Sequence, residues 1–253
     1  MIDVHSHILP GVDDGAKTLE ESLAMLRLAA GSGTTDIVAS PHANHEYKFD
    51  PDVNSLLLAD LRHAIGGTIR IHHGCDFHLS YDNIQDALKN PRKYAINNKN
   101  YVLVEFSDLL IPKTTDDVFY QMRMAGMIPI ITHPERNMLL QQRLNQLKAW
   151  AESGCLLQVT GGSLLGRFGK QAKAFADRLM KEGLAHIVAS DAHDTRHRPP
   201  SLKEAFEYVA RTYGPERAEM LFHANPAAVL TGDPVDPYPE VVLPQKKWFQ
   251  FWT

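Results

Sequence analysis

Short runs of β-branched and other apolar residues recur along the chain, and amphipathic stretches separate them. Such short runs, bounded by turn residues, are typical of strands that are buried on both faces, as in parallel sheets. The pattern predicts seven strands, at residues 2–5, 35–40, 69–74, 101–106, 128–132, 155–160 and 186–190.

The amphipathic stretches predict five helices, at residues 19–31, 116–125, 138–152, 171–182 and 201–212. Thr18 and Glu21 have the spacing of a capping box at the start of the first helix. The alternation of strands and helices favours a parallel sheet, and seven strands favour a closed or nearly closed α/β barrel. A doubly wound open sheet is the alternative, but no Gly-x-Gly-x-x-Gly motif follows the first strand to support it.

Length, net charge, apolar runs and cysteine count limit the classes of protein to which the chain can belong. The 253 residues are enough for one large domain or two small ones. A net charge of -4 gives no general electrostatic reason to bind nucleic acid or an anionic membrane. The sequence has no secretory signal and no apolar run of about 18 residues. Two cysteines are too few for a disulfide framework, so we expect a cytoplasmic protein. Because the chain has no long apolar run, we expect that it does not span a membrane.

The C-terminal segment, residues 232–253, differs in character from the rest of the chain. Four prolines interrupt it, and aromatic residues are concentrated between Lys246 and Trp252. One interpretation is a strap that covers a hydrophobic groove, and another is a contact with a partner or a membrane surface. We therefore divide the chain into a domain of residues 1–231 and a tail of residues 232–253.

Histidines and carboxylates follow six of the seven predicted strands, and only the strand at 155–160 lacks one. In parallel α/β barrels, functional groups gather at the carboxyl ends of the strands. Each residue alone has an ordinary structural explanation, such as a buried ion pair or a turn, but several ionised groups on one rim need a compensating cation. The residues concerned are His5, His7, His42, Asp76, Glu105, His133, Asp191 and His193.

The types of side chain indicate a metal and an anionic substrate. Imidazole nitrogens and carboxylate oxygens without thiolates suit manganese, zinc or iron, and more than six ligands imply two or three ions. Arg136 and Arg198 follow predicted ligands, and guanidinium groups match phosphoryl oxygens. Pairing with a carboxylate is the alternative role for Arg198. A cysteine phosphatase is excluded, because the required arginine is replaced by Tyr81 after Cys75 and by Gly161 after Cys155.

Several motifs together resemble one family. They are Met1–Gly15, Ser40-Pro41-His42, Gly74-Cys75-Asp76, Val104–Ser107, His133-Pro134-Glu135-Arg136, Ala189–His193, Arg198-Pro199-Pro200 and Asn225-Pro226. Over residues 1–231 the chain resembles the bacterial tyrosine-protein phosphatases of the PHP (polymerase and histidinol phosphatase) superfamily, of the CpsB/YwqE type. The resemblance implies a distorted seven-stranded (β/α)7 barrel of the PHP type.

The resemblance also implies three divalent metal ions, usually manganese, and assigns their ligands. His5, His7, Asp76 and Asp191 would hold the first ion. Asp76 would bridge to a second ion on Glu105 and His133, and Asp14, His42 and His193 would hold the third. Arg136 and Arg198 match the family's phosphate-binding arginines. The family usually has Glu at the position of Asp76, and since Asp is shorter, His78 is an alternative partner for the bridge.

The activity that the resemblance implies is hydrolysis of phosphotyrosine, by attack of a metal-bridging hydroxide on phosphorus. The implied substrate is the tyrosine-rich tail of a bacterial tyrosine autokinase that controls capsule or exopolysaccharide synthesis. The alternatives are a small-molecule phosphomonoesterase of the same superfamily, with a substrate such as histidinol phosphate, a metal-dependent amidohydrolase, and a non-enzymatic metal-dependent scaffold or sensor.

Overall fold

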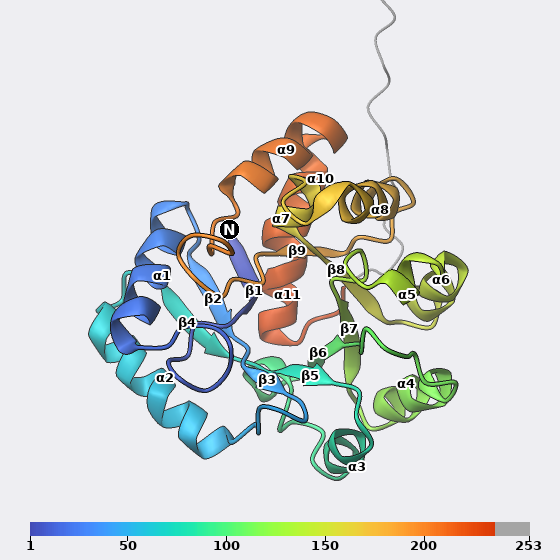
Figure 1. Ribbon diagram of the computed structural model, residues 1–253, viewed down its shortest axis with the longest axis horizontal. Helices are drawn as coiled ribbons and strands as arrows, with labels where there is room; N and C mark the ends of the chain where they lie inside the picture. The colour runs from blue at the N-terminus through green and yellow to red at the C-terminus, as the bar shows by residue number, and fades with distance from the viewer. Residues whose placement is uncertain (236–253) are drawn as a thin grey trace, which may run out of the picture.

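Parallel strands surround the centre of the molecule, and helices cover them on the outside (Figure 1). The computed structural model describes residues 1–235, so most of the predicted tail lies outside the described residues. Every strand pairing is parallel, which confirms the α/β class. The strands are β1 (Ile2–Ser6), β2 (Asp36–Ala39), β3 (His42–Ala43), β4 (Arg70–His73), β5 (Asp76–His78), β6 (Tyr101–Glu105), β7 (Ile128–Thr132), β8 (Leu156–Thr160) and β9 (Ile187–Ala189).

The predicted count of seven strands in one barrel is not confirmed. The described chain forms nine strands in two sheets, with the orders β1-β2-β4 and β3-β5-β6-β7-β8-β9. The two strands that were not predicted, β3 and β5, follow β2 and β4 after short breaks at Ser40-Pro41 and at Gly74-Cys75. Pro41 lacks an N–H, and the Gly74 N–H donates to the Ala39 carbonyl at 2.9 Å. The two breaks are therefore adjacent. At this point both segments of the chain leave the first sheet, which contains β2 and β4, and enter the second, which contains β3 and β5.

On the other side, a single isolated β-bridge joins the two sheets within the described residues. Ser6 pairs with Ala192 after β9, and the Asp191 N–H donates to the His5 carbonyl at 2.9 Å. Continuous sheet hydrogen bonding therefore does not close a barrel within residues 1–235. The bridge nevertheless brings the segment after β9 beside the end of β1, where two predicted ligands lie.

The long outer helices begin and end close to the predicted positions, with two differences. Residues 138–152 form two helices separated at Gln142-Arg143, and the prediction missed the helices at 51–65 and 81–89. The helices are α1 (Leu19–Gly31), α2 (Pro51–Ile65), α3 (Tyr81–Lys89), α4 (Thr115–Met124), α5 (Met138–Gln141), α6 (Leu144–Glu152), α7 (Gly161–Leu164), α8 (Gly169–Lys181), α9 (Lys203–Tyr213), α10 (Pro215–Glu219) and α11 (Asn225–Thr231), with a 3-10 turn at Ile96–Asn98 and a π turn at Met220–Ala224. No helix within residues 1–235 is long and apolar enough to cross a membrane.

Half of the predicted capping box is present at the start of α1. The Thr18 hydroxyl accepts from the Glu21 N–H at 3.2 Å. The Glu21 carboxylate accepts from the Lys17 N–H at 2.8 Å, and not from the Thr18 N–H that a full box requires.

An apolar core fills most of the space between the strands, and polar residues occupy one end of this space. The core includes one or more side chains from β1, β2, β6, β7, β8 and β9. Ile96, Val229 and Leu230 close it from the 3-10 turn and α11, which pack near the first residues of the strands. The carboxyl ends of the strands, at the opposite end, carry the predicted site.

Candidate metal centre

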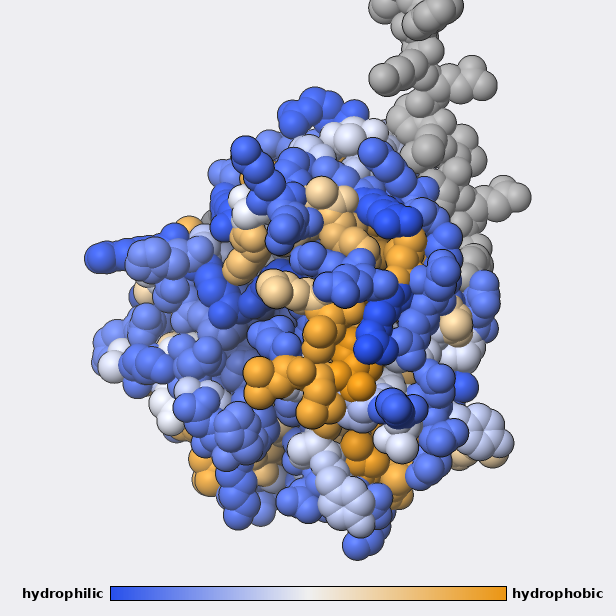
Figure 2. Space-filling view, turned by 45° about the vertical axis from the view of Figure 1, so that its right-hand side comes forward, coloured by the Kyte–Doolittle hydropathy of each residue, from blue (hydrophilic) through white to orange (hydrophobic). Residues whose placement is uncertain are grey.

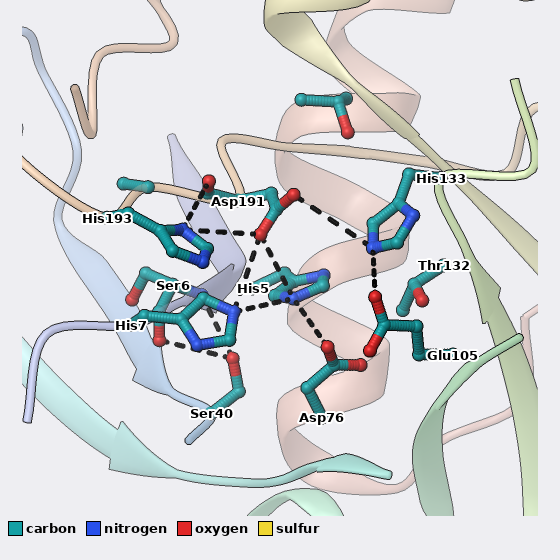
Figure 3. Close-up of polar contacts among 12 residues, drawn as sticks. His5, Ser6, His7, Ser40, Asp76, Glu105, Thr132, His133, Asp191 and His193 are labelled. Carbon is teal, nitrogen blue, oxygen red and sulfur yellow. Dashed lines mark hydrogen bonds and ion pairs between the residues drawn. The ribbon is translucent and has the colours of Figure 1, made fainter. Parts of the chain in front are cut away.

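All nine predicted histidines and carboxylates come together in one cluster, at or after the carboxyl ends of β1, β2, β4, β6, β7 and β9. Figure 3 labels all of them except Asp14 and His42. They come from β1, β3, β5 and β6 and from the loops after β1, β7 and β9. Their ligand atoms form four overlapping groups, each with its atoms within 4.8 Å of one another. The groups are His7, Asp14, His42 and His193; His5, His7 and Asp76; His5, His133 and Asp191; and His42, Asp76 and Glu105.

His5 and His7 lie two residues apart and therefore point to the same side of the β1 segment. Their Nε2 atoms are 3.3 Å apart, and each lies 3.4 Å from Oδ1 of Asp191. Their Nδ1 atoms are already engaged. His5 Nδ1 donates to Gln158 Oε1 at 2.9 Å, and His7 Nδ1 donates to Asp13 Oδ2 at 2.7 Å. Such hydrogen bonds fix imidazole rings so that Nε2 is available for a metal.

Gln158 and Asp13 are functional candidates that the sequence analysis missed. Gln158 lies on β8, in the strand that seemed to lack a site residue, and it is buried. Asp13 also accepts from the Gly15 N–H at 2.9 Å and from the His42 N–H at 3.1 Å. The signals were present: Gln158 is the polar residue within an apolar strand, and Asp13 lies next to a predicted ligand in a Gly-rich turn.

Gly15 allows the loop after β1 to fold back onto His7. A Cβ atom at Gly15 would lie 2.0 Å from the His7 carbonyl oxygen and 2.5 Å from the His7 Cβ. The Ala16 N–H donates to the same carbonyl at 3.1 Å. The chain thereby returns Asp13 to His7 and carries Asp14 to the edge of the site.

Asp76 lies between the histidines of two different groups. Its Oδ2 is 3.1 Å from His42 Nδ1 and 3.6 Å from His5 Nε2. His78, the alternative partner, is 3.8 Å from the Glu105 carboxylate and belongs to none of the four groups. The shorter side chain of Asp76 therefore reaches the centre of the cluster, while its role as a bridge between two ions stays a prediction.

The chemistry of this donor set fits divalent cations. Both oxygens of Asp76 and Nδ1 of His42 are buried, and none of them makes a hydrogen bond of suitable geometry within residues 1–235, although Oδ2 and Nδ1 are only 3.1 Å apart. A buried carboxylate needs a positive charge beside it, which either protonated imidazoles or a bound cation would supply. With only nitrogen and oxygen donors, the set matches manganese, zinc or iron.

The carboxylates change the protonation of the histidines around them. Burial opposes protonation of His5, but Asp191 and Asp76 outweigh it and raise its pKa to about 9. Burial likewise opposes protonation of His42, but Asp14 and Asp76 raise its pKa to about 11. Without a metal, protons on these rings therefore balance the buried carboxylates. A bound metal would displace them.

The two predicted arginines lie on the outer side of the cluster. Arg136 donates from Nη1 to Oδ2 of Asp191, and Arg198 donates from Nη2 to the same oxygen at 2.5 Å. Pairing with a carboxylate, the alternative role considered for Arg198, is thus present. Oδ1 of Asp191 faces His5 and His7, whereas Oδ2 binds the arginines and lies 3.9 Å from His133 Nε2. The Arg198 Nε is buried without a partner within residues 1–235.

Two residues of the site have an unusual backbone conformation. His133 has φ +33° and Asp191 has φ +51°, in the region that residues other than glycine rarely adopt. Each directly follows or closely follows a strand end, where the chain must turn sharply for the side chain to enter the cluster. Such conformations concentrate at functional sites, where the surrounding structure maintains them.

Comparison with known proteins identifies the family. Residues 1–231 match the family model described as capsular polysaccharide synthesis, CpsB/CapC. The chain belongs to the CpsB/CapC family. The tyrosine-protein phosphatase YwqE of Bacillus subtilis is 34% identical, with 100% of both chains covered. The tyrosine-protein phosphatase CpsB of Streptococcus agalactiae is 31% identical, over 91% of this chain and 98% of that protein.

Solved structures agree with this assignment. A crystal structure from the work on YwqE of Bacillus subtilis and CpsB of Streptococcus pneumoniae, described as metal-dependent tyrosine phosphatases, is 33% identical. It superposes with a TM-score of 0.88 and covers 95% of this CpsB/CapC chain and 99% of the other chain. A lactonase from Listeria monocytogenes shares the fold, with a TM-score of 0.60 at 13% identity over 92% of this chain.

Proposed function

We propose that this CpsB/CapC family member is a metal-dependent protein-tyrosine phosphatase. The observation that carries the proposal is the convergence of nine histidines and carboxylates beside two arginines, at the carboxyl ends of parallel strands. The family relatives that are named tyrosine-protein phosphatases, at 31% and 34% identity over nearly the whole chain, support it.

The proposed metal site holds three divalent ions, most readily manganese. In this proposal, His5, His7, Asp76 and Asp191 bind the first ion, Asp76, Glu105 and His133 bind the second, and Asp14, His42 and His193 bind the third. His7 also lies in the group around Asp14, so it is a further candidate for the third ion. Bound ions would activate a water molecule at neutral pH and neutralise phosphoryl oxygens.

The side chains of the protein then position the substrate. Arg136 and Arg198 bind phosphoryl oxygens through donors that now meet Asp191, and the buried Arg198 Nε supplies an additional donor. Fixed donors of this kind stabilise the charge that develops in the transition state. A tyrosyl leaving group has a pKa near about 10, so its departure depends less on a general acid than that of a serine alkoxide.

The finer features of the molecule belong to the same proposal. We infer that β2 with β3, and β4 with β5, are two interrupted strands of a distorted seven-stranded barrel, because only two residues separate the members of each pair. We place the phosphatase domain at residues 1–231, in the cytoplasm, where the free and buried Cys75 and Cys155 would stay reduced. The proposed partner is the phosphotyrosine tail of a bacterial tyrosine kinase in a capsule or exopolysaccharide system.

Phosphate release by the purified, manganese-loaded protein tests the function. We expect rapid release from phosphotyrosine peptides, much slower release from phosphoserine peptides and histidinol phosphate, and loss of activity after chelation. Efficient cleavage of histidinol phosphate with none of phosphotyrosine would replace the proposal with a small-molecule phosphomonoesterase. Full activity in a His7→Ala protein would exclude the metal site as the catalytic centre.

A further inference from the structure

The loop between α7 and α8, which follows β8 along the chain, brings an aromatic side chain to a proposed phosphate-binding residue. Phe168 lies between α7 and α8, and the guanidinium carbon of Arg136 is 4.4 Å from the centroid of its ring. The ring is half-buried, so one part packs against the protein and another part stays open to solvent. The one predicted strand without a metal ligand is thus followed by an apolar wall beside an arginine of the site.

The structure holds the Phe168 ring in this place. A Cβ atom at Gly162 would lie 2.9 Å from Cε2 of Phe168, so the glycine provides the space that the ring occupies. The neighbouring Arg167 donates to the Glu204 carboxylate on α9 at 2.6 Å, which ties the loop to a second element. The position of the ring therefore follows from packing on both sides of the loop.

A small cavity and exposed apolar side chains lie next to Arg136 and His133. The cavity has a volume of about 90 Å³, and its lining includes Phe106 and Asp108. Leu109, 89% exposed, follows this lining on the loop after β6, and Met138, 67% exposed, lies two residues after Arg136. Figure 2 shows hydrophobic residues gathered on this side of the molecule within a mostly hydrophilic surface.

We infer that Phe168 is a specificity-determining residue that contacts the aromatic ring of the phosphotyrosyl side chain. The inference rests on the proposed function. Phe168 covers a face of the Arg136 guanidinium, so a phosphoryl group meets the N–H groups at its edge. The substrate ring begins one bond beyond the ester oxygen, which places it beside the open part of Phe168. Aromatic pairs attract through offset or edge contacts, and a seryl group offers no such surface.

Two variants separate contact with the substrate from support of Arg136. Phe168→Leu keeps an apolar side chain of similar size against Arg136 and Gly162 but removes the aromatic ring, whereas Phe168→Tyr keeps the ring. The measurement is kcat/KM of the manganese-loaded protein on a phosphotyrosine peptide and on the phosphoserine peptide of the same sequence. Comparing the ratio between variants cancels the different reactivity of the two leaving groups.

We expect Phe168→Leu to lower the phosphotyrosine-to-phosphoserine ratio about three- to tenfold, mainly through KM, and Phe168→Tyr to preserve it. Unchanged metal content and melting temperature in both variants would show that the fold is intact. An equal loss on both peptides would mean that Phe168 only supports Arg136, and an unchanged ratio would mean that it touches no substrate; either overturns the inference alone. A wild-type protein inactive on phosphotyrosine would overturn the proposed function as well.

Discussion

At the scale of single residues, Asp13 links two predicted ligands without being one of them. Its carboxylate accepts hydrogen bonds from the His7 ring and the His42 N–H, and also from the Gly15 N–H. Loss of an outer carboxylate that orients a ligand histidine typically weakens metal binding about 10- to 100-fold. We expect Asp13→Asn to cause such a loss at the third proposed ion, for which His42 is a ligand and His7 a further candidate, measured by metal titration and elemental analysis. The exposed Asp60→Asn is the control, and full metal content in Asp13→Asn would contradict the prediction.

Gly15 and Gly31 provide a test variant and its matched control for the loop after β1, because Gly15 lies in this loop and Gly31 lies in α1. A methyl group at Gly15 meets the His7 backbone at 2.0 Å, whereas one at Gly31, within α1, meets nothing within 4 Å. We expect Gly15→Ala to lower the free energy of unfolding by about 1–3 kcal/mol because the loop must move. Gly31→Ala should be neutral or stabilise by up to about 1 kcal/mol. Urea unfolding of both variants measures this, and equal stabilities would show that the loop adapts without cost.

At the scale of elements, Asp36 joins β2 to β4. Its carboxylate accepts from Arg70 through Nε at 2.7 Å and Nη2 at 2.6 Å, and from His72 at 2.9 Å. Burial opposes ionisation, but Arg70 and His72 outweigh it and lower the pKa of Asp36. A carboxyl whose pKa falls on folding stabilises the protein above its unfolded pKa, near about 4, and this stabilisation disappears as the pH falls through the lower folded value.

The corresponding variant is Asp36→Asn. We expect it to reduce the free energy of unfolding by about 1–2 kcal/mol at pH 7, since Arg70 is largely exposed and the pair is partly screened. The difference from the wild type should shrink progressively as the pH falls below about 4. Urea unfolding at several pH values measures it, with Asp60→Asn as the control. A difference that is independent of pH would show that the ionised carboxylate is not the cause.

The elements also show why some features could be predicted from sequence and others could not. β6 and β7 are continuous apolar runs, and they were predicted within one residue. α2 was not predicted because its apolar residues lie on several faces of the helix, with Leu58 buried and Leu56 70% exposed. α3 is short, and its apolar stripe is limited to the buried Ala87 and the partly buried Ile84 and Leu88, which is too little for a local pattern to predict a helix. The strand breaks at Pro41 and Gly74 depend on contacts between distant segments, which local patterns do not contain.

At the scale of the whole molecule, the convergence of the candidate ligands could be predicted better than the fold. Ligand residues must be histidines or carboxylates at strand ends, and all nine predicted ones converge. Gln158 and Asp13 were missed because they act through other side chains, and Phe168 because an aromatic residue in a loop carries no distinctive signal. The closure of the sheets into a seven-stranded barrel stays a prediction, since it depends on the hydrogen-bond register between β1 and the segment after β9.

Metal binding should stabilise the whole molecule, and more so as the pH rises. Without metal, the raised pKa values of His5, about 9, and His42, about 11, keep both rings protonated near neutral pH. A metal must displace these protons, so below pH 9 its affinity increases with pH, up to about tenfold per pH unit for each proton released. Since a metal that binds only the folded state stabilises it by RT ln(1 + [L]/Kd), each tenfold gain in affinity adds about 1.4 kcal/mol.

Thermal unfolding at a fixed manganese concentration measures this coupling. For a protein of this size, we expect the manganese-induced rise in Tm, relative to chelated protein, to grow between pH 6 and 8 by about 3–5 °C per pH unit for each proton that the metal displaces. His42→Gln removes one of the two displaced protons and should reduce the slope, whereas the exposed His45→Gln should leave it unchanged. A manganese-induced shift that is equal at every pH would show that these histidines do not exchange protons for metal, and hence that the buried carboxylates are balanced in another way.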